Sequence, residues 1–409
     1  MIPLETLRVA LRALLRNKMR SFLTMLGIII GVGAVIAMVA IGEGAKARVE
    51  ESFASMGSNL LIVMPGSTNA GGARGGFGSM PTLTWDDLRA IRGEISTVRY
   101  AAAQLRTNAQ LQSEDQNWST TVTGTSPEYF LIRSWRAASG RSLLDSDIDA
   151  SAKVVVLGQT VVDKLFGASA DPVGQTIRIK NIPFEVVGVL AKKGQSPMGQ
   201  DYDDGVFVPQ TTFASKIQGG LQKFLQGTIF VGATSTDATA RAEEQISVLL
   251  RDRHRIGPGQ DDDFSVRNLT EMANAQQEGM KTLTTLLASI AAVSLLVGGI
   301  GIMNIMLVSV TERTREIGVR MAVGATPINI LTQFLVEALT LSVAGGLIGI
   351  GIGVLGANQL AAKFGWPMLI RPDIVLVSVA FSGFVGVVFG LYPAQKASRL
   401  DPIDALRYE

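Results

Sequence analysis

The sequence contains no cysteine and a single histidine, His254, among its 409 residues. Without cysteine no disulfide can form, so any domain outside the cytoplasm must be held together by its core. His254 stands between Arg253 and Arg255, and the sequence has no other histidine or cysteine that could bind a metal ion together with it. We therefore expect a surface histidine, neither a metal ligand nor a member of a nucleophile–His–acid arrangement.

The sequence also lacks the phosphate-binding motif Gly-x-x-x-x-Gly-Lys-Ser/Thr. A glycine-rich segment at 66–79 has the glycine density of a phosphate loop. It is not followed by Gly-Lys-Ser/Thr, however, and it is not bracketed by a strand and a helix, so we expect a mobile loop. The sequence accordingly predicts no enzyme activity, and no catalytic, cofactor-binding or metal-binding residue on this chain.

Charge is scarce, because only 18% of the residues are charged and 47% are hydrophobic. That balance is too apolar for an ordinary soluble protein. Long apolar runs predict four membrane-spanning helices, at 21–42, 283–310, 330–362 and 373–393. The first run is longer than the core of a signal peptide, and no clean Ala-x-Ala site follows it, so we expect a retained span.

The placement of lysine and arginine predicts the orientation of these spans. Basic residues precede the first span and follow the second and the fourth. By the positive-inside rule both termini and the 311–327 loop are cytoplasmic, in a multi-pass inner-membrane protein. The outer segment 43–281 carries 24 basic and 27 acidic residues, whereas the remainder holds 13 and 8. This distribution suits a membrane protein and does not suggest binding to nucleic acid.

The predicted fold class is therefore a membrane protein with four transmembrane helices and a large α+β extracytoplasmic domain, 43–280, between the first and second. Residues 1–20 have leucines on one helical stripe and arginines opposite, which predicts an amphipathic helix lying on membrane lipids. Helix-compatible segments at 43–53 and 269–285 predict stalks that carry the chain between membrane and domain. Residues 394–409 form a cytoplasmic tail.

Strand and helix patterns divide the outer domain into two predicted lobes. Strand–helix–strand units occur at both ends of the domain and indicate a first lobe made of 57–112 and 214–268. A β-rich block at 113–213 predicts a second lobe inserted into the first, with a hairpin-like turn at Asn181-Ile182-Pro183.

The charged segment between the second and third spans is the best candidate for a functional site. Glu316 and Arg320 have the i, i+4 spacing that supports a short helix, and Ile317 and Met321 lie on an adjacent stripe that could enter a groove on a partner. Gly324 predicts the helix stop. We interpret 312–323 as a coupling helix docked on an energy-supplying ATPase, although a basic loop that only fixes topology is the alternative. The candidate coupling residues are Glu312, Arg313, Arg315, Glu316, Ile317, Gly318, Arg320, Met321 and Gly324.

Two features within the apolar runs add to this picture. Glu337 is the one acid in or near the third run, and a structural contact is the expected role because a proton pathway would need further ionisable groups. Glycines at 298, 299, 301, 345, 346, 349, 351 and 353 predict close helix contacts and no wide pore.

Three separated segments resemble motifs of the MacB-type ABC permeases, a superfamily that also includes LolC/LolE and FtsX. They are 17–27 near the start, 301–325 around the coupling segment, and 390–407 near the end. The resemblance extends over essentially the whole chain. It implies a permease homodimer in which the outer domain has a porter-like lobe and a sabre-like lobe.

The resemblance also implies partners and a function. MacB carries an N-terminal ATPase domain that this sequence does not show, so we expect two copies of a separate ABC ATPase to bind the ATP and Mg. A periplasmic adaptor and an outer-membrane exit duct are further expected partners. The implied function is efflux of drugs, peptides or toxins by mechanotransmission. LolC/LolE-like lipoprotein extraction and FtsX-like regulation of a cell-wall hydrolase without transport remain open.

Overall fold

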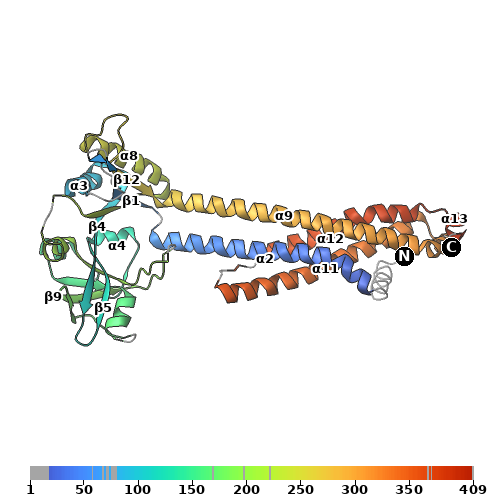
Figure 1. Ribbon diagram of the computed structural model, residues 1–409, viewed down its shortest axis with the longest axis horizontal. Coiled ribbons are helices and arrows are strands. Elements are labelled where there is room, and N and C mark those ends of the chain that lie inside the picture. The colour runs from blue at the N-terminus through green and yellow to red at the C-terminus, as the bar shows by residue number, and fades with distance from the viewer. Residues whose placement is uncertain are drawn as a thin grey trace. The chain divides into compact units, whose positions relative to one another are not determined.

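The computed structural model describes residues 18–57, 59–66, 69–70, 73–74, 81–167, 170–196, 199–220, 223–365, 368–369 and 371–407. It has two compact units, and Figure 1 labels their elements. The helical unit comprises Met1–Arg48 and Gln277–Glu409, and the α+β domain comprises Val49–Gln276. Most of the predicted amphipathic helix, 1–20, and most of the glycine-rich segment, 66–79, lie outside the described residues.

Four helices in the described part of the chain are long and apolar enough to cross a membrane. They are α2 (Lys18–Met56), α9 (Leu269–Glu312), α11 (Pro327–Phe364) and α12 (Pro372–Ser398). Each contains one of the four predicted spans. Helices α2 and α9 continue without a break through the predicted stalk segments 43–53 and 269–285, so each of them belongs to both units.

Glycines bring the long helices of the helical unit into backbone contact. A Cβ atom on Gly27 of α2 would lie 2.7 Å from the Cα of Gly298 on α9, and one on Gly353 of α11 would lie 2.7 Å from the carbonyl oxygen of Gly33 on α2. These contacts confirm the expected role for several of the predicted glycines. Gly301 and Gly351 differ, because no atom of another described element lies within 4 Å of a Cβ placed on either of them.

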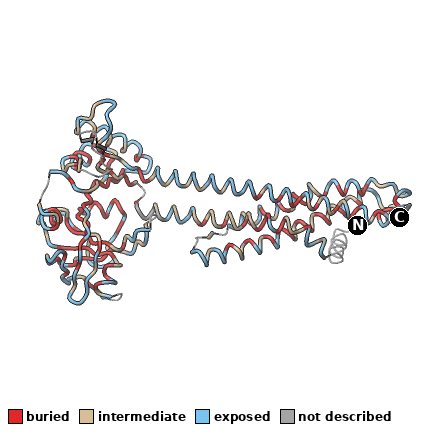
Figure 2. The backbone as a smooth tube through the Cα atoms, in the orientation of Figure 1, coloured by how far each residue is buried: buried red, intermediate tan, exposed pale blue. Residues whose placement is uncertain are grey.

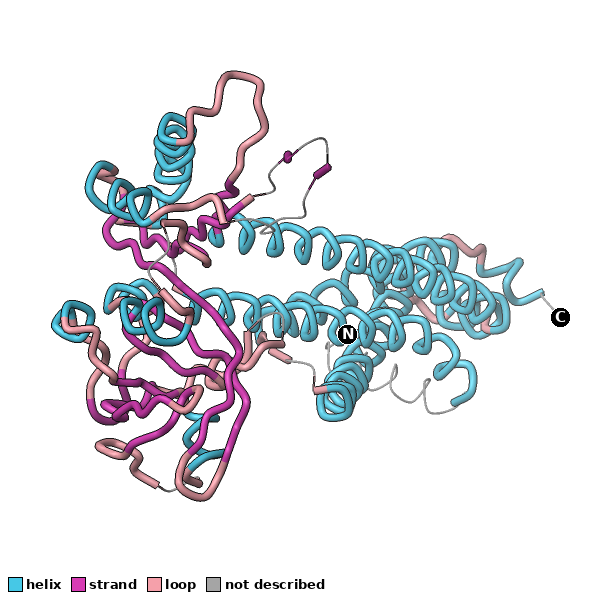
Figure 3. The backbone as a smooth tube through the Cα atoms, turned by 60° about the vertical axis from the view of Figure 1, so that its left-hand side comes forward, coloured by secondary structure: helices cyan, strands magenta, loops and turns pink. Residues whose placement is uncertain are grey.

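Ten strands form one mixed sheet in the described part of the α+β domain, coloured magenta in Figure 3. Its path is β12-β1-β11-β4-β5-β10-β7-β9-β6, and β8 pairs with β4 and β9. The strand bounds are β1 Leu60–Pro65, β4 Val98–Gln112, β5 Asn117–Thr125, β6 Ala137–Gly140, β7 Val154–Leu157, β8 Thr176–Ile179, β9 Ile182–Leu190, β10 Gly205–Pro209, β11 Gly227–Ala233 and β12 Phe264–Asn268. A separate short pair joins β2 (Asn69–Ala70) to β3 (Ala73–Arg74).

The first four strands of this path form a split βαβ arrangement. Helix α3 (Trp85–Glu94) connects β1 to β4, and α8 (Thr239–Arg253) connects β11 to β12. Strand β1 pairs antiparallel with both β11 and β12, while β11 pairs antiparallel with β4. The two predicted strand–helix–strand units therefore interlock, since each places a strand between the two strands of the other.

The remaining helices of the domain are short. They are α4 (Pro127–Ile132), α5 (Asp145–Asp149), α6 (Gln159–Leu165), α7 (Gln210–Thr212), which continues as the π-helical turn η1 (Phe213–Ile217), and the 3₁₀ turn η2 (Thr236–Ala238). Of these, only α6 agrees with a helix that the sequence predicts, at Gln159 to Phe166 within the β-rich block. A turn joins β8 to β9, but it lies one residue earlier than predicted: Ile182 and Pro183 already belong to β9, and the turn consists of Lys180 and Asn181, both with positive φ. That is the conformation that a two-residue type I′ hairpin requires.

Side chains alternate between two hydrophobic cores, one on each face of the sheet. Leu61 and Val63 of β1 belong to the larger core, under α3 and α8, while Leu60 belongs to the core under α4. The same alternation on β4 sends Ala101 and Ala103 to one core and Ala102 to the other. Figure 2 shows buried residues concentrated along these strands.

Strand β4 is shared by both predicted lobes. Its residues 98–105 pair with β11, and its residues 105–112 pair with β5, so that Leu105 has a partner on each side. Hydrogen bonding is thus continuous from the first lobe into the second. The division at 112/113 remains a prediction.

Candidate functional site

The coupling segment folds as a short helix between two long ones. Helix α9 ends at Glu312, Arg313 is the N-cap residue, and α10 runs from Thr314 to Ala322. The hydroxyl of Thr314 donates to the carbonyl oxygens of Val310 and Thr311, at 3.1 and 2.8 Å. These bonds satisfy the hydroxyl where the chain leaves α9, and they close the turn between the two helices.

A left-handed residue ends α10, at the position where the sequence predicts the stop. Gly324 has φ +107°. The N–H of Gly324 donates to the carbonyl oxygen of Met321, and the N–H of Ala325 donates to that of Arg320. Thr326 then caps α11 by accepting a hydrogen bond from the N–H of Asn329. The connection is therefore short and fully hydrogen-bonded, as a rigid loop requires.

One face of α10 is buried within the chain itself. Ile317 is 1% exposed in a cluster with residues of the long helices, and Met321 packs against the same cluster. A Cβ on Gly318 would lie 2.8 Å from the Cβ of Ala405. Ala405 belongs to α13 (Pro402–Arg407), which packs on α10. The contact predicted between Ile317 and a partner is thus made internally, and Gly318 provides the space for α13.

The opposite face of α10 is exposed and combines charged with apolar side chains. Val319 is 48% exposed and Val323 84%. Glu312, Arg315 and Gly324 are also exposed. Sequence reasoning missed the two valines because it took Ile317 and Met321 for the apolar stripe. Their position on the face of the helix opposite Ile317 is the signal that could have identified them.

Two arginines fix α10 to the neighbouring helices. Arg320 forms the predicted ion pair with Glu316, and its Nη1 donates to Oε1 of Gln333 on α11 at 2.8 Å. Nη1 of Arg313 lies 3.2 Å from Oε2 of Glu337, whose side chain is 8% exposed. Glu337 thus has the structural contact that the sequence led us to expect. These contacts tie the short helix to the start of α11.

Helix α13 was not predicted, because 394–409 was taken to be a tail. The N–H of Ile403 donates to Oδ1 of Asp401 at 2.8 Å, and Pro402 opens the helix. An aspartate followed by proline is a helix-start signal that the sequence reading overlooked. Ile403 and Leu406 are 66% and 44% exposed. Helix α13 therefore adds exposed apolar side chains beside α10.

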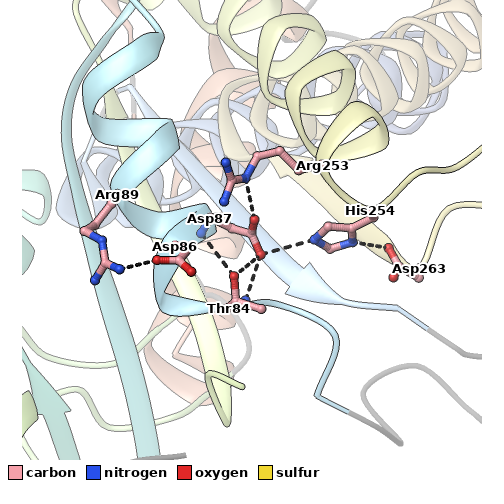
Figure 4. A network of polar contacts seen from close by, with 7 residues as sticks. All are labelled: Thr84, Asp86, Asp87, Arg89, Arg253, His254 and Asp263. Atoms are coloured by element: carbon pink, nitrogen blue, oxygen red, sulfur yellow. Dashed lines mark hydrogen bonds and ion pairs between the residues drawn. The ribbon is translucent and has the colours of Figure 1, made fainter. Parts of the chain in front are cut away.

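The α+β domain holds a polar network around the single histidine, shown in Figure 4. Nε2 of His254 lies 3.2 Å from Oδ2 of Asp87, and Nδ1 lies 2.7 Å from Oδ1 of Asp263. Arg253 also donates to Asp87, at 2.7 Å. The prediction of a surface histidine was wrong, because the imidazole is only 10% exposed. Asp87 is 167 positions away in the sequence and Asp263 is nine, so the adjacent Arg253 and Arg255 did not indicate this burial.

The network shifts the ionisation of both of its buried members. Hydrogen bonding to Asp87, opposed by burial and reinforced by Asp263, raises the pKa of His254 from 6.5 to about 8. Burial alone raises the pKa of Asp87, but hydrogen bonds from His254, Thr84 and Arg253 outweigh it and hold that pKa far below its usual value. Thr84 and Asp87 also form the capping box of α3. The network joins the start of α3 to the end of α8.

Comparison with known proteins places the chain in a family. Residues 21–249 match the MacB-like periplasmic core domain, and residues 288–402 match the FtsX-like permease C-terminal domain. The Macrolide export ATP-binding/permease protein MacB of Azoarcus sp. is 45% identical over 99% of this chain and 60% of its own length. The protein of the same name from Syntrophobacter fumaroxidans is 42% identical over 99% of this chain and 64% of its own.

The chain thus spans about three fifths of the length of these curated relatives. The crystal structure of the periplasmic region of MacB from Actinobacillus actinomycetemcomitans, 22% identical, covers 56% of this chain and 98% of that chain with a TM-score of 0.45. The match to the periplasmic core domain includes more than half of the chain, and the second match includes α10 and ends at the first residue of α13. This multi-pass inner-membrane protein, with an α+β domain between its first two apolar helices, belongs to the MacB-type family of ABC transporter permeases.

Proposed function

We propose that this chain is the permease subunit of an ABC exporter and that it transmits the motion of a separate ATPase to its extracytoplasmic α+β domain. The observation that carries the proposal is α10, a short helix fixed on one face to its own chain and exposed on the other. A rigid element of this kind transfers a displacement to the long helices with little loss. Helices α9 and α11, which flank α10, are both candidate spans.

The docking surface that we propose combines α10 with α13. Val319 and Val323 supply apolar contacts, and Arg315 and Glu316 supply charges that fix the register on the ATPase. Arg313 and Arg320 act behind this surface, because their bonds to Glu337 and Gln333 hold α10 against α11. Ile317 and Gly318 support the surface from below. Glu312, Met321 and Gly324 complete the coupling segment.

The assembly that we propose follows the relatives' printed name, which joins ATP binding to macrolide export. Two copies of this chain bind two ATPase subunits, and ATP and Mg bind to those subunits alone. Closure of the ATPase pair displaces α10, and α2 and α9 carry the displacement to the α+β domain. The expelled cargo belongs to the class of drugs, peptides or toxins, and a periplasmic adaptor with an outer-membrane exit duct completes the path.

A coupling assay tests this proposal. The tagged chain is expressed in its host, the ATPase that co-purifies with it is identified, and both are reconstituted in proteoliposomes with a macrolide as cargo. We expect Arg320→Glu and Glu316→Lys to insert normally but to lose ATP-driven transport. Ala322→Ser, an exposed change on the same helix, is the control. Normal transport by both charge variants, or ATP hydrolysis by the chain alone, contradicts the proposal.

The orientation has its own test, which exploits the absence of cysteine. Ala150→Cys and Val323→Cys introduce single thiols at exposed positions of the α+β domain and the coupling segment. In intact spheroplasts we expect a membrane-impermeant maleimide to label the first thiol and to label the second only after permeabilisation. The reverse pattern would overturn the assignment of α10 to the cytoplasm.

A regulatory role is the second candidate, because the region that contains α10 matches a domain named for FtsX. In that role the same motion activates a cell-wall hydrolase and no cargo moves. Lipoprotein extraction of the LolC/LolE kind is the third. ATP turnover that depends on α10 without macrolide transport would favour these two over efflux, and capture of lipidated cargo would separate them.

A further inference from the structure

The α+β domain contains a buried cation that its own residues do not neutralise. Arg133 follows α4 and is 4% exposed. Its Nε and Nη2 atoms are closed to solvent and have no hydrogen-bond partner among the residues that the structure describes. The remaining nitrogen, Nη1, lies at 3.5 Å from the hydroxyl of Tyr129, which is a long contact. Leaving charged donors buried without partners is costly.

The two free nitrogens share one edge of the guanidinium plane. That edge presents two nearly parallel N–H groups, the geometry that binds both oxygens of a carboxylate or two oxygens of a phosphate. Aromatic rings surround the rest of the group, with the guanidinium carbon 4.5 Å from the ring centre of Tyr202 and 6.0 Å from that of Trp135. The rings stabilise the cation through their faces, and the described residues supply no hydrogen-bond acceptor to Nε or Nη2.

A second cation lies beside the first. The ammonium of Lys193 donates to the carbonyl oxygen of Arg133 at 2.5 Å and lies 5.1 Å from the ring centre of Trp135. Burial, and then the charge of Arg133, lower the pKa of Lys193 from 10.5 to about 7, and Asp203 offsets only part of this shift. A half-buried lysine thus lies next to the buried arginine.

The nearby carboxylates do not neutralise these cations. Both oxygens of Asp203 accept backbone N–H groups, from Lys193 and Gly194, each at 2.8 Å. Glu128 on α4 uses Oε1 in an ion pair with Arg92 at 2.5 Å, and its Oε2 has no hydrogen-bond partner in the described part of the chain. Neither acid makes an ion pair with Arg133 among the described residues. The Nε and Nη2 groups of Arg133 could therefore be satisfied by a hydrogen-bond acceptor from outside the chain.

We propose that Arg133 and Lys193 form a binding site for a small oxyanion, whose carboxylate or phosphate oxygens accept two hydrogen bonds from Nε and Nη2 of Arg133. Tyr202 and Lys193, which come from the connection between β9 and β10, form one wall of the site. Trp135, which precedes β6, forms another. Because the free edge is closed to solvent, the anion enters by displacing the wall that Tyr202 provides.

Thermal unfolding of the full chain in detergent tests the site directly. Acetate and inorganic phosphate are titrated separately at pH 6.5 and constant ionic strength, with chloride as the reference anion, and the intrinsic tryptophan fluorescence, to which Trp135 contributes, is followed in parallel. We expect a saturable rise in the unfolding temperature with at least one oxyanion. A response to acetate alone assigns a carboxylate site, a response to phosphate alone assigns a phosphate site, and no saturable response overturns the proposal.

Matched variants assign the effect to the two cations. Arg133→Lys keeps the charge but removes the two-pronged edge, and we expect its affinity for the oxyanion to fall at least about tenfold. Arg99→Lys is the control, since Arg99 is exposed and its guanidinium lies over Tyr100 at 5.4 Å. An unchanged affinity in Arg133→Lys contradicts the proposal. If that variant does not fold, Lys193→Gln replaces it, with the same expected loss and the same contradiction.

A pH series gives an independent reading. A bound anion favours the charged form of Lys193, so acetate affinity falls at least about tenfold between pH 6 and pH 8.5 as the lysine loses its proton. Acetate itself stays ionised over this range. In Lys193→Gln we expect the pH dependence to disappear. An affinity independent of pH in the unmodified chain excludes Lys193 from the site. None of these measurements involves the ATPase, so their outcome is independent of the proposed transport function.

Discussion

The α+β domain and the helical unit differ in the residues that make their tightest packing contacts. In the domain the largest fully buried side chains include Tyr129, Phe184 and Phe213. In the helical unit close contacts between helices involve glycines, as between Gly27 and Gly298, and many large apolar side chains are exposed, although Phe334 and Ile28 are buried. Figure 2 shows the difference along α9, much of which is exposed.

The difference follows from the solvent around each region. Water drives large apolar side chains into a core, because their burial is the dominant favourable term in folding. Lipid supplies no such drive between helices, so close backbone approach and dense packing of small residues hold them together instead. Exposed residues such as Leu376, Ile290 and Phe384 then serve as contacts with lipid.

The sharpest test applies the same substitution in both regions. Phe184→Ala removes a fully buried ring from the core of the domain, and we expect a loss of about 3–5 kcal/mol in its free energy of unfolding. Phe384→Ala removes a ring that is 62% exposed in the helical unit, and the expected change is below about 1 kcal/mol. Equal effects in chemical unfolding of the full chain in detergent would refute the comparison.

A substitution of the opposite kind, from small to large, tests the glycine contacts of the helical unit. Gly27→Leu forces a side chain into the backbone of α9, and we expect about 3 kcal/mol of destabilisation together with loss of a monodisperse peak in size-exclusion chromatography. Gly301→Leu is the control, because a Cβ there meets no atom of another described element within 4 Å. If the two leucine variants behave alike, glycine contacts do not hold the helices.

The polar network of the domain predicts a smaller effect that depends on pH. The raised pKa of His254 adds stability that is complete below its unfolded pKa of 6.5 and is lost as the pH rises through about 8. The lowered pKa of Asp87 adds stability that is present above 3.8 and is lost as the pH falls through its folded pKa. Both contributions are therefore complete between about pH 4 and pH 6.5.

The variant His254→Gln isolates the histidine. We expect the stability difference between the native chain and the variant to shrink by on the order of 1 kcal/mol between pH 6.5 and pH 9. Lys193 has the opposite trend, because its lowered pKa makes stability rise with pH above about 7, but it is present in both proteins and cancels. If the stability difference between the native chain and the variant stays constant or grows between pH 6.5 and pH 9, the network does not raise the pKa of His254.

The smallest expected effect concerns the exposed ion pair of α10. Glu316→Gln removes its partner charge from Arg320, and an exposed i, i+4 pair contributes only about 0.3–0.5 kcal/mol. We expect thermal unfolding to stay almost unchanged while ATP-driven transport decreases. A large loss of stability would mean that the pair holds the helix, in which case a loss of transport could not be attributed to docking.

Local patterns in the sequence predicted most of the elements but not which faces are covered. The apolar runs identified the long helices, and the strand and helix patterns identified the two strand–helix–strand units and the β-rich block between them. Helical periodicity placed Ile317 and Val319 on different faces of one helix. It could not show which face is buried, because the burial of Ile317 depends on contacts with long helices and the space at Gly318 is filled by α13, some 80 residues away.

The polar contacts of His254 and of Arg133 could not be predicted from the sequence either, because they too depend on long-range contacts. His254 meets Asp87 across 167 positions of sequence, and Lys193 meets Arg133 across 60. No spacing rule links such pairs, since the sheet order that brings them together is set by long-range strand pairing. The short helices α4 and α5 have too few residues to show a period.

Strand β4 has a mechanical consequence. The first half of β4 pairs with β11 and its second half with β5, and Leu105 pairs with both. The two parts of the sheet therefore share one continuous strand. A shared strand should prevent the two parts of the sheet from hinging apart, so that they move relative to one another mainly by twisting about the axis of β4. A force applied to β12 or β1 should therefore reach β5 as a change in the twist of the sheet.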